Sequence, residues 1–381
     1  MFLFQSIMSL DEMLMNYVNL QTYELPITAL RDALLELSTD QRAQIIGKTV
    51  SIVGNTPISV AVLKNHSQIL QHLLDSLDKK SIFGLLTTLC SKGESALHFA
   101  ARKGNVEIMD FMLDAVLPEY KQALMKVTNG TGHIALHYAI MHGHKEMVKC
   151  ILNVLTESER LELLKVQSVT GNTAIHHAAL LNHAEIMDCL LNTISSEDEK
   201  YKLLCIRGGE SSLSIDFAAK HTLPNAIRCM VDSVPPDMMY DLMKKTRHGG
   251  NPALHYAALA GSTKSLQCML EKLTADQRYE LLTMPGQLGV TVMHTAARGG
   301  HFEAIRCMVE SVPPEKQMDL IQARNINNQM PLEIVSRKNS LETADLITRW
   351  MSLVEERSKK REGISVSNQC VYTRPPKSKT F

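Results

Sequence analysis

The sequence repeats one short pattern at a nearly constant period over most of its length. A histidine in an apolar, small-residue context, as in "ALHFAA" at 96–101, recurs at an equivalent position, which we call the anchor. The anchors are Ser59, His98, His137, His176, Asp216, His255, His294 and Glu333. They are 39 residues apart, except for one interval of 40. A fixed period of this length predicts a chain of stacked structural repeats.

Each repeat is predicted to contain three helices. A glycine stands five residues before most anchors, and glycine or asparagine stands six residues after most of them, as expected at tight turns. Between the turns lies a first helix, and an amphipathic second helix such as "EIMDCLL" at 185–191 follows. A third helix begins at a capping pair such as Thr156 with Glu159, or at a proline. The related stretch "STDQRAQIIG" at 38–47 predicts a degenerate unit before the first anchor.

These motifs resemble the ankyrin repeat family over roughly residues 50–350. The matching stretches are "NTPISVA", "SALHFAARKGN", "NTAIHHAALLNH" and "VMHTAARGGH". The resemblance implies an all-α, ankyrin-type solenoid of helix-turn-helix units with glycine-containing loops. The usual period is about 33 residues, and the surplus here coincides with the third helix. HEAT, armadillo and TPR arrays are the alternative, but they do not need the recurring glycine before the anchor.

The expected domain organisation follows from the limits of the repeat. Residues 1–49 are predicted to form a degenerate capping unit, and residues 50–353 to form the ankyrin-like array. Residues 354–381 are polar and basic, as in "EERSKKREG", and are predicted to form a disordered tail.

The recurring histidines are predicted to be structural. A catalytic or metal-binding group is needed once, whereas these side chains occur once per unit, and stacked units about 10 Å apart are too widely spaced for their anchors to share a zinc ion. Each ring is expected to form a hydrogen bond with the backbone or a hydroxyl of an adjoining loop. Cysteines thirteen residues after the anchors share positions with Phe111, and are predicted to lie on a buried face of the second helix. These are Cys150, Cys189, Cys229, Cys268 and Cys307.

Composition excludes several function classes. Lys plus Arg and Asp plus Glu are each 40, so no net charge attracts nucleic acid, and only 5% of residues are aromatic. No apolar run is long enough to span a membrane, and no CxxC motif occurs. We therefore expect a cytoplasmic, or through "KKR" a nuclear, protein without cofactor, metal or small-molecule substrate. No catalytic motif is present, and Cys205 with His248 is the only pair that an enzyme hypothesis offers.

Binding is expected at positions that vary between repeats. These are the loop tip before the anchor and the two residues at the end of the first helix, which the resemblance places along one concave groove. The candidate residues are Lys92, Glu94, Arg102, Lys103, His133, Met141, His142, Thr170, Leu180, Leu181, Lys220, His221, His248, Gln287 and Arg298. The apolar residues Met141, Val169, Leu180 and Leu181 either form a binding patch or pack under the long loops.

The sequence thus favours a non-catalytic scaffold or adaptor that binds a protein partner. A regulatory or targeting subunit of an enzyme complex is the alternative, and a nucleic-acid-associated regulator acting through the basic tail is less favoured. The partner's identity does not follow from the sequence.

Overall fold

The computed structural model describes residues 32, 34–48, 54–245, 252–334, 348–349, 351–352 and 356. Within these residues the chain is all-helical and forms two compact units, Met1–Ser214 and Ile215–Phe381. The division falls in the repeat whose anchor is Asp216 instead of histidine. Most of the predicted capping unit and of the predicted tail lies outside the described residues.

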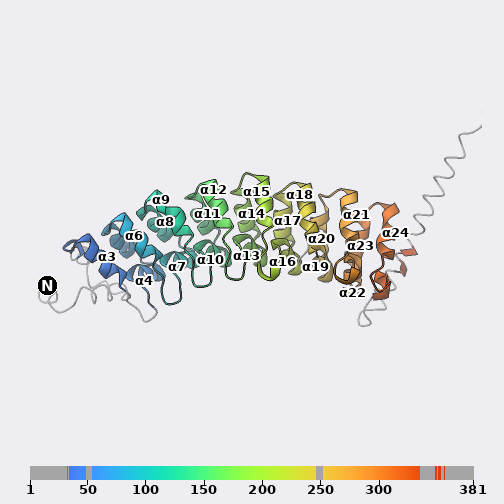
Figure 1. The fold of residues 1–381 in the computed structure, drawn as a ribbon, viewed down its shortest axis with the longest axis horizontal. Coiled ribbons are helices and arrows are strands. Elements are labelled where there is room, and N and C mark those ends of the chain that lie inside the picture. Colours follow the sequence, from blue (N-terminus) through green and yellow to red (C-terminus); the bar gives the residue numbers. More distant parts are fainter. Residues whose placement is uncertain are drawn as a thin grey trace, which may run out of the picture. The chain divides into compact units, whose positions relative to one another are not determined.

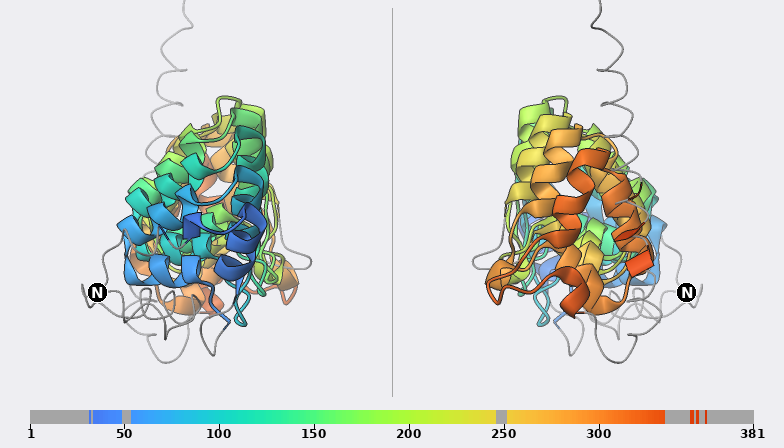
Figure 2. Two further views of the ribbon diagram at one scale, coloured as in Figure 1. Left: turned by 90° about the vertical axis from the view of Figure 1, so that its left-hand side faces the viewer. Right: turned by 90° about the vertical axis from the view of Figure 1, so that its right-hand side faces the viewer.

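The first unit consists of helices in three layers (Figure 1). The first helices are α4 (Pro57–Lys64), α7 (Ala96–Lys103), α10 (Ala135–Met141) and α13 (Ala174–Leu180). The second helices are α5 (Ser67–Asp75), α8 (Val106–Ala115), α11 (Lys145–Asn153) and α14 (Ala184–Asn192). The third helices are α3 (Thr39–Gly47), α6 (Lys79–Thr87), α9 (Pro118–Met125), α12 (Glu157–Leu164) and α15 (Glu197–Leu204), and a short 3-10 turn, η1 (Gly209–Ser211), follows. Viewed from the end, successive repeats of this unit are stepped one behind another (Figure 2).

The second unit repeats the same three-helix pattern. Its first helices are α16 (Ser214–Lys220), which begins at the division, α19 (Ala253–Leu259) and α22 (Val292–Gly299). Its second helices are α17 (Pro224–Asp232), α20 (Thr263–Leu270) and α23 (Phe302–Glu310). Its third helices are α18 (Pro236–Lys244), α21 (Ala275–Thr283) and α24 (Pro314–Gln322), with 3-10 turns η2 (Gln287–Gly289) and η3 (Pro331–Ile334).

The predicted caps explain where the third helices begin. Ser38, Thr156 and Thr274 each form a capping box with the residue three positions later. In α18 and α24 a proline takes the first position instead, where its missing N–H costs little. The three-helix repeat predicted from the sequence is therefore confirmed.

The turns around each first helix need a left-handed backbone. Gly93, before α7, has φ +74°, and Gly104, after it, has φ +70°. Asn65 and Asn182 have positive φ at the position that corresponds to Gly104. The glycine and asparagine positions therefore mark the boundaries of the first helix because other residues rarely adopt this conformation.

The core lies between the layers. Ala96 to Ala101, the first six residues of α7, are all buried, and the small side chains at Ala100 and Ala101 allow neighbouring first helices to approach closely. The paired leucines that close the third helix, such as Leu163 and Leu164, are also buried. Each repeat thus buries its apolar surface against the adjacent repeats.

Candidate functional site

The anchor histidines connect each repeat to the loop of the next. Nδ1 of His98 accepts hydrogen bonds from the Ser95 backbone N–H at 3.1 Å and from the Ser95 hydroxyl at 2.8 Å. Its Nε2 lies 2.9 Å from the carbonyl oxygen of His133 in the following loop. These bonds are satisfied together by the neutral tautomer that carries its proton on Nε2. Nε2 of His176, His255 and His294 makes the equivalent contact at 3.3, 3.0 and 2.8 Å.

The anchor histidines are therefore structural, as the sequence predicted. Burial is the largest cause that lowers their pKa values, to about 4 for His176 and His255. Nδ1 of His255 has no hydrogen-bond partner, and the reason is local, because Pro252 stands where other repeats supply a backbone N–H.

One anchor departs from this pattern. Nδ1 of His137 accepts a bond from the Ile134 backbone N–H at 3.2 Å, but its buried Nε2 makes no well-formed hydrogen bond and interacts only with the Val166 backbone. The rings of His133 and His177 lie against it, with centroid distances of 5.6 and 5.2 Å, and are 5.3 Å from each other. Burial lowers the pKa of each of these histidines, to about 4 for His177 and well below its ordinary value for His137. This histidine cluster was not predicted from the sequence.

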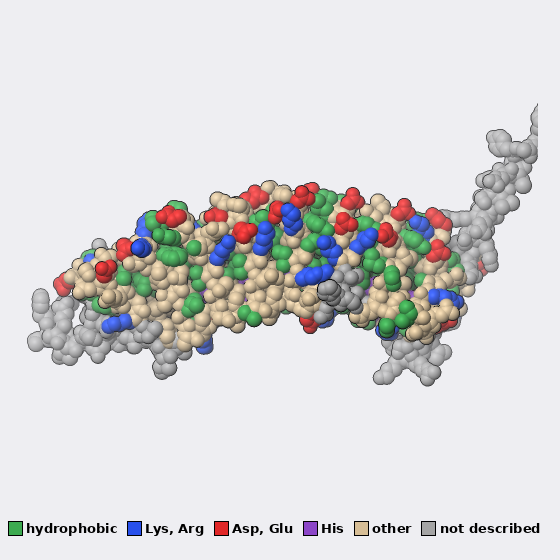
Figure 3. Space-filling view, in the orientation of Figure 1, with side chains coloured by type: hydrophobic (Ala, Val, Ile, Leu, Met, Phe, Trp, Pro, Cys, Tyr) green, Lys and Arg blue, Asp and Glu red, His purple; other side chains and the backbone are tan. Residues whose placement is uncertain are grey.

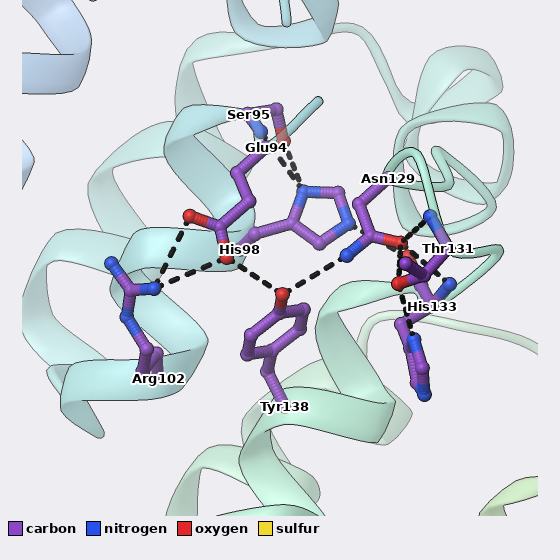
Figure 4. A network of polar contacts seen from close by, with 8 residues as sticks. All are labelled: Glu94, Ser95, His98, Arg102, Asn129, Thr131, His133 and Tyr138. Atoms are coloured by element: carbon purple, nitrogen blue, oxygen red, sulfur yellow. Dashed lines mark hydrogen bonds and ion pairs between the residues drawn. The ribbon is translucent and has the colours of Figure 1, made fainter. Parts of the chain in front are cut away.

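A polar network joins the end of α7 to the loop before it and to α10 (Figure 4). Glu94 forms an ion pair with Arg102 at 3.1 Å and accepts a hydrogen bond from the Tyr138 hydroxyl at 2.6 Å. The same hydroxyl accepts a bond from Asn129 Nδ2 at 3.0 Å. Burial, followed by the bond to Glu94, raises the pKa of Tyr138 to about 12. Loop, first helix and neighbouring repeat are therefore held together by one set of bonds.

The structure places most of the predicted binding residues on the surface, with one clear exception. Glu94 is only 7% exposed because Arg102 and Tyr138 cover it, so its role lies within the network. Half-buried residues are Arg102, His133 and Met141. Exposed residues are Lys92, Lys103, His142, Thr170, Leu180, Leu181, Lys220, His221, Gln287 and Arg298, and His248 lies outside the described residues.

Exposed apolar side chains accompany these residues in the first unit. Leu180 and Leu181, at the end of α13, are 38% and 41% exposed, and Val169 in the preceding loop is 77% exposed. The loops therefore leave both leucines accessible to solvent.

The cysteines that stand thirteen residues after the anchors are less buried than predicted. Cys268 is buried, but Cys150, Cys189, Cys229 and Cys307 are only partly covered. Burial raises the pKa of the Cys150 thiol to about 12, with a further contribution from its bond to Asp110. Cys90, which lies outside this set of positions, is buried. In the described part of the chain, no group of three or more His, Cys, Asp or Glu side chains is arranged to hold a metal ion.

Stacked three-helix repeats joined by histidine-to-loop bonds define a helical-repeat solenoid. The family model described as "Ankyrin repeats (3 copies)" matches residues 32–121 and 116–201. The same helices, turns and anchors continue beyond the matched region. The chain is an ankyrin repeat protein.

Two solved structures illustrate the similarity. The ankyrin repeat protein EF0377 has 20% sequence identity and a TM-score of 0.43, with 57% of this chain and 95% of that chain covered. The ankyrin repeat domain of human ASB11 has 19% identity and a TM-score of 0.46, with 67% of this chain and 97% of that chain covered. No curated protein matches the sequence. Among the described helices, none is long and apolar enough to cross a membrane.

Proposed function

We propose that this protein is a non-catalytic scaffold or adaptor that binds a protein partner along the loop edge of its repeats. We define the loop edge as the exposed C-terminal ends of the first helices together with the loops that precede those helices. Ankyrin repeats are generally protein–protein interaction modules, which supports the class of function. The partner and the face that it contacts are our inference.

This proposal rests on a difference between the positions that recur in the repeats and the positions that vary from one repeat to the next. Residues that recur between repeats are used internally, as with His98, which is buried and bonded at both ring nitrogens. Residues that differ between repeats are exposed at the end of the first helix, as with Lys103, His142 and Leu181. A rigid array that presents variable side chains binds a partner at little cost in ordering entropy.

An affinity experiment tests the proposal. The full chain would be compared with a variant carrying Lys103→Glu, Leu180→Ser and Leu181→Ser, and with the control Lys80→Glu. Lys80 is an exposed lysine in the first turn of α6, away from the loop edge, so the control makes the same charge change elsewhere. Circular dichroism would first establish that all three proteins are equally folded.

The expected result is selective loss of binding. Proteins retained from a cell extract by the wild type and by Lys80→Glu, and quantified by mass spectrometry, should be depleted on the triple variant. Equal retention by all three proteins would contradict the placement of the site on the loop edge. Turnover of any substrate by the purified chain would contradict its non-catalytic character.

A further inference from the structure

Charge is unevenly divided between the helix layers of the first unit. The first helices α4, α7, α10 and α13 contain three cations, Lys64, Arg102 and Lys103, and no carboxylate. The second helices α5, α8, α11 and α14 contain seven carboxylates and two lysines. The zero net charge of the whole chain therefore conceals a cationic layer beside an acidic one.

The cations are also grouped along the stack. Lys92 and Lys103 belong to the loop edge of the second repeat, whose anchor is His98. Both are exposed and have no ion-pair partner among the residues that the structure describes. Glu94, the one carboxylate in the adjoining loop, is already neutralised by Arg102 and covered by Tyr138. A surplus of positive charge thus remains at this end of the loop edge.

The other end of the same edge is apolar. The positions that hold Arg102 and Lys103 in the second repeat hold Met141 and His142 in the third, and Leu180 and Leu181 in the fourth. Both leucines are exposed. The pKa of His142 is lowered by burial and by the neighbouring His144 and Arg102, which favours the neutral ring. The edge therefore changes from cationic to apolar over three repeats.

We propose that the loop edge of the first unit binds an extended peptide segment with carboxylates in one half and large apolar side chains in the other. This inference rests on the proposed function and specifies the partner's chemistry. Repeats about 10 Å apart correspond to about three residues of extended chain, so acidic and apolar positions lie about six residues apart. The carboxylates face Lys92 and Lys103, and the apolar side chains face Leu180 and Leu181.

A peptide fits this surface better than a nucleic acid does. A phosphate backbone carries uniform charge and gains nothing from exposed leucines, whereas a peptide can match both halves. No Phe, Tyr or Trp side chain is exposed among the described first-helix ends of this unit to provide a stacking platform for bases.

Selection from a display library of random 12-residue peptides against the full chain tests the proposal. Selected peptides are expected to segregate Asp and Glu from Leu, Ile, Met or Phe. Fluorescein-labelled copies would be titrated by fluorescence polarisation against the wild type, Lys92→Glu/Lys103→Glu, Leu180→Ser/Leu181→Ser and the control Lys80→Glu. Each double variant should weaken binding about tenfold or more, which corresponds to about 1.4 kcal/mol, and the control less than about twofold. Peptides with lysine in place of their carboxylates should prefer Lys92→Glu/Lys103→Glu.

Other outcomes separate this inference from the proposed function. If selected peptides lack carboxylates and only Leu180→Ser/Leu181→Ser weakens them, the loop edge binds proteins but the charge assignment is wrong. If no peptide is selected, or neither double variant weakens binding, the peptide assignment fails, and the protein-retention comparison separately decides the broader function. Tighter binding of a 12-nucleotide single strand than of the peptides at 150 mM salt overturns the inference in favour of phosphate. A dimer in sedimentation that dissociates in Leu180→Ser/Leu181→Ser overturns it in favour of a second copy of the chain.

Discussion

Gly104, at the end of α7, lies directly against the imidazole of His144, at the start of α11 in the next repeat. A methyl group on Gly104 would stand 2.6 Å from His144 Nδ1, and Nε2 of the same ring lies 3.0 Å from the carbonyl oxygen of Arg102. Because Gly104 also has φ +70°, Gly104→Ala adds backbone strain to the displacement of the ring. We expect the free energy of unfolding in urea to fall by about 2–4 kcal/mol.

Gly84→Ala is the matched control for this substitution. Gly84 lies within α6, and a methyl group there meets nothing within 4 Å. Since alanine favours helix over glycine by up to about 1 kcal/mol, this variant should be slightly stabilised. A similar loss of stability in both variants would contradict the specific role assigned to the contact between Gly104 and His144.

Acid should weaken the fold before the carboxylates titrate. The pKa of His177 is lowered to about 4 by burial, whereas an unfolded histidine has a value near 6.5. The unfolded chain therefore binds more protons in this window, and the stabilising contribution is lost as pH falls from about 6.5 towards 4. Over this window, each such histidine should lower the free energy of unfolding by up to about 1.4 kcal/mol for each unit by which the pH falls. Urea unfolding between pH 7.5 and 5 measures the slope.

His177→Tyr isolates the share of the histidine cluster in this slope. The equivalent position holds tyrosine at Tyr138 and Tyr256, so the repeat accommodates an aromatic ring there. The variant should lose about 1.4 kcal/mol per pH unit of the dependence between pH 6 and 5. An unchanged slope would show that His177 is protonated equally in the folded and unfolded chain.

The hydrogen bond from the Tyr138 hydroxyl to the buried Glu94 carboxylate should contribute measurably to the free energy of unfolding. Tyr138→Phe removes the hydroxyl that Glu94 and Asn129 share, and leaves a buried carboxylate with Arg102 as its remaining partner. We expect a loss of about 1–3 kcal/mol in urea unfolding. Tyr120→Phe is the control because the contact recorded for Tyr120 is ring stacking on Phe83, with centroids 4.8 Å apart, and should change stability by less than about 0.5 kcal/mol. Equal effects would assign the cost to the ring and not to the hydroxyl.

The features that could be predicted from the sequence are those that depend on short local motifs and on the repeat period. Caps such as Thr156 with Glu159, and turns such as Gly104, are encoded within a few residues, so the three-helix repeat could be inferred directly. The histidine cluster could not, because His133 and His177 occupy different columns of the repeat and meet only when two repeats stack. Glu94 was expected to contact a partner. Its burial could not be predicted either, because the Tyr138 side chain that covers it comes from the next repeat. Contacts between side chains at different positions of neighbouring repeats depend on how the repeats stack, and the repeat pattern of a single sequence does not specify this.

The anchor column provides a comparison between two histidines that differ mainly in their partners. His98→Leu leaves the Ser95 N–H, the Ser95 hydroxyl and the His133 carbonyl without the ring atoms that they contact, at a cost of about 2–4 kcal/mol. His137→Leu leaves the Ile134 N–H unpaired and removes a buried Nε2 that has only a weak interaction with the Val166 backbone, so its cost should be smaller, about 1 kcal/mol. Urea unfolding of both variants at pH 7.5, where both rings are neutral, gives the difference. Equal losses would contradict this difference, and would show that the contact between Nε2 of His98 and the His133 carbonyl adds little to stability.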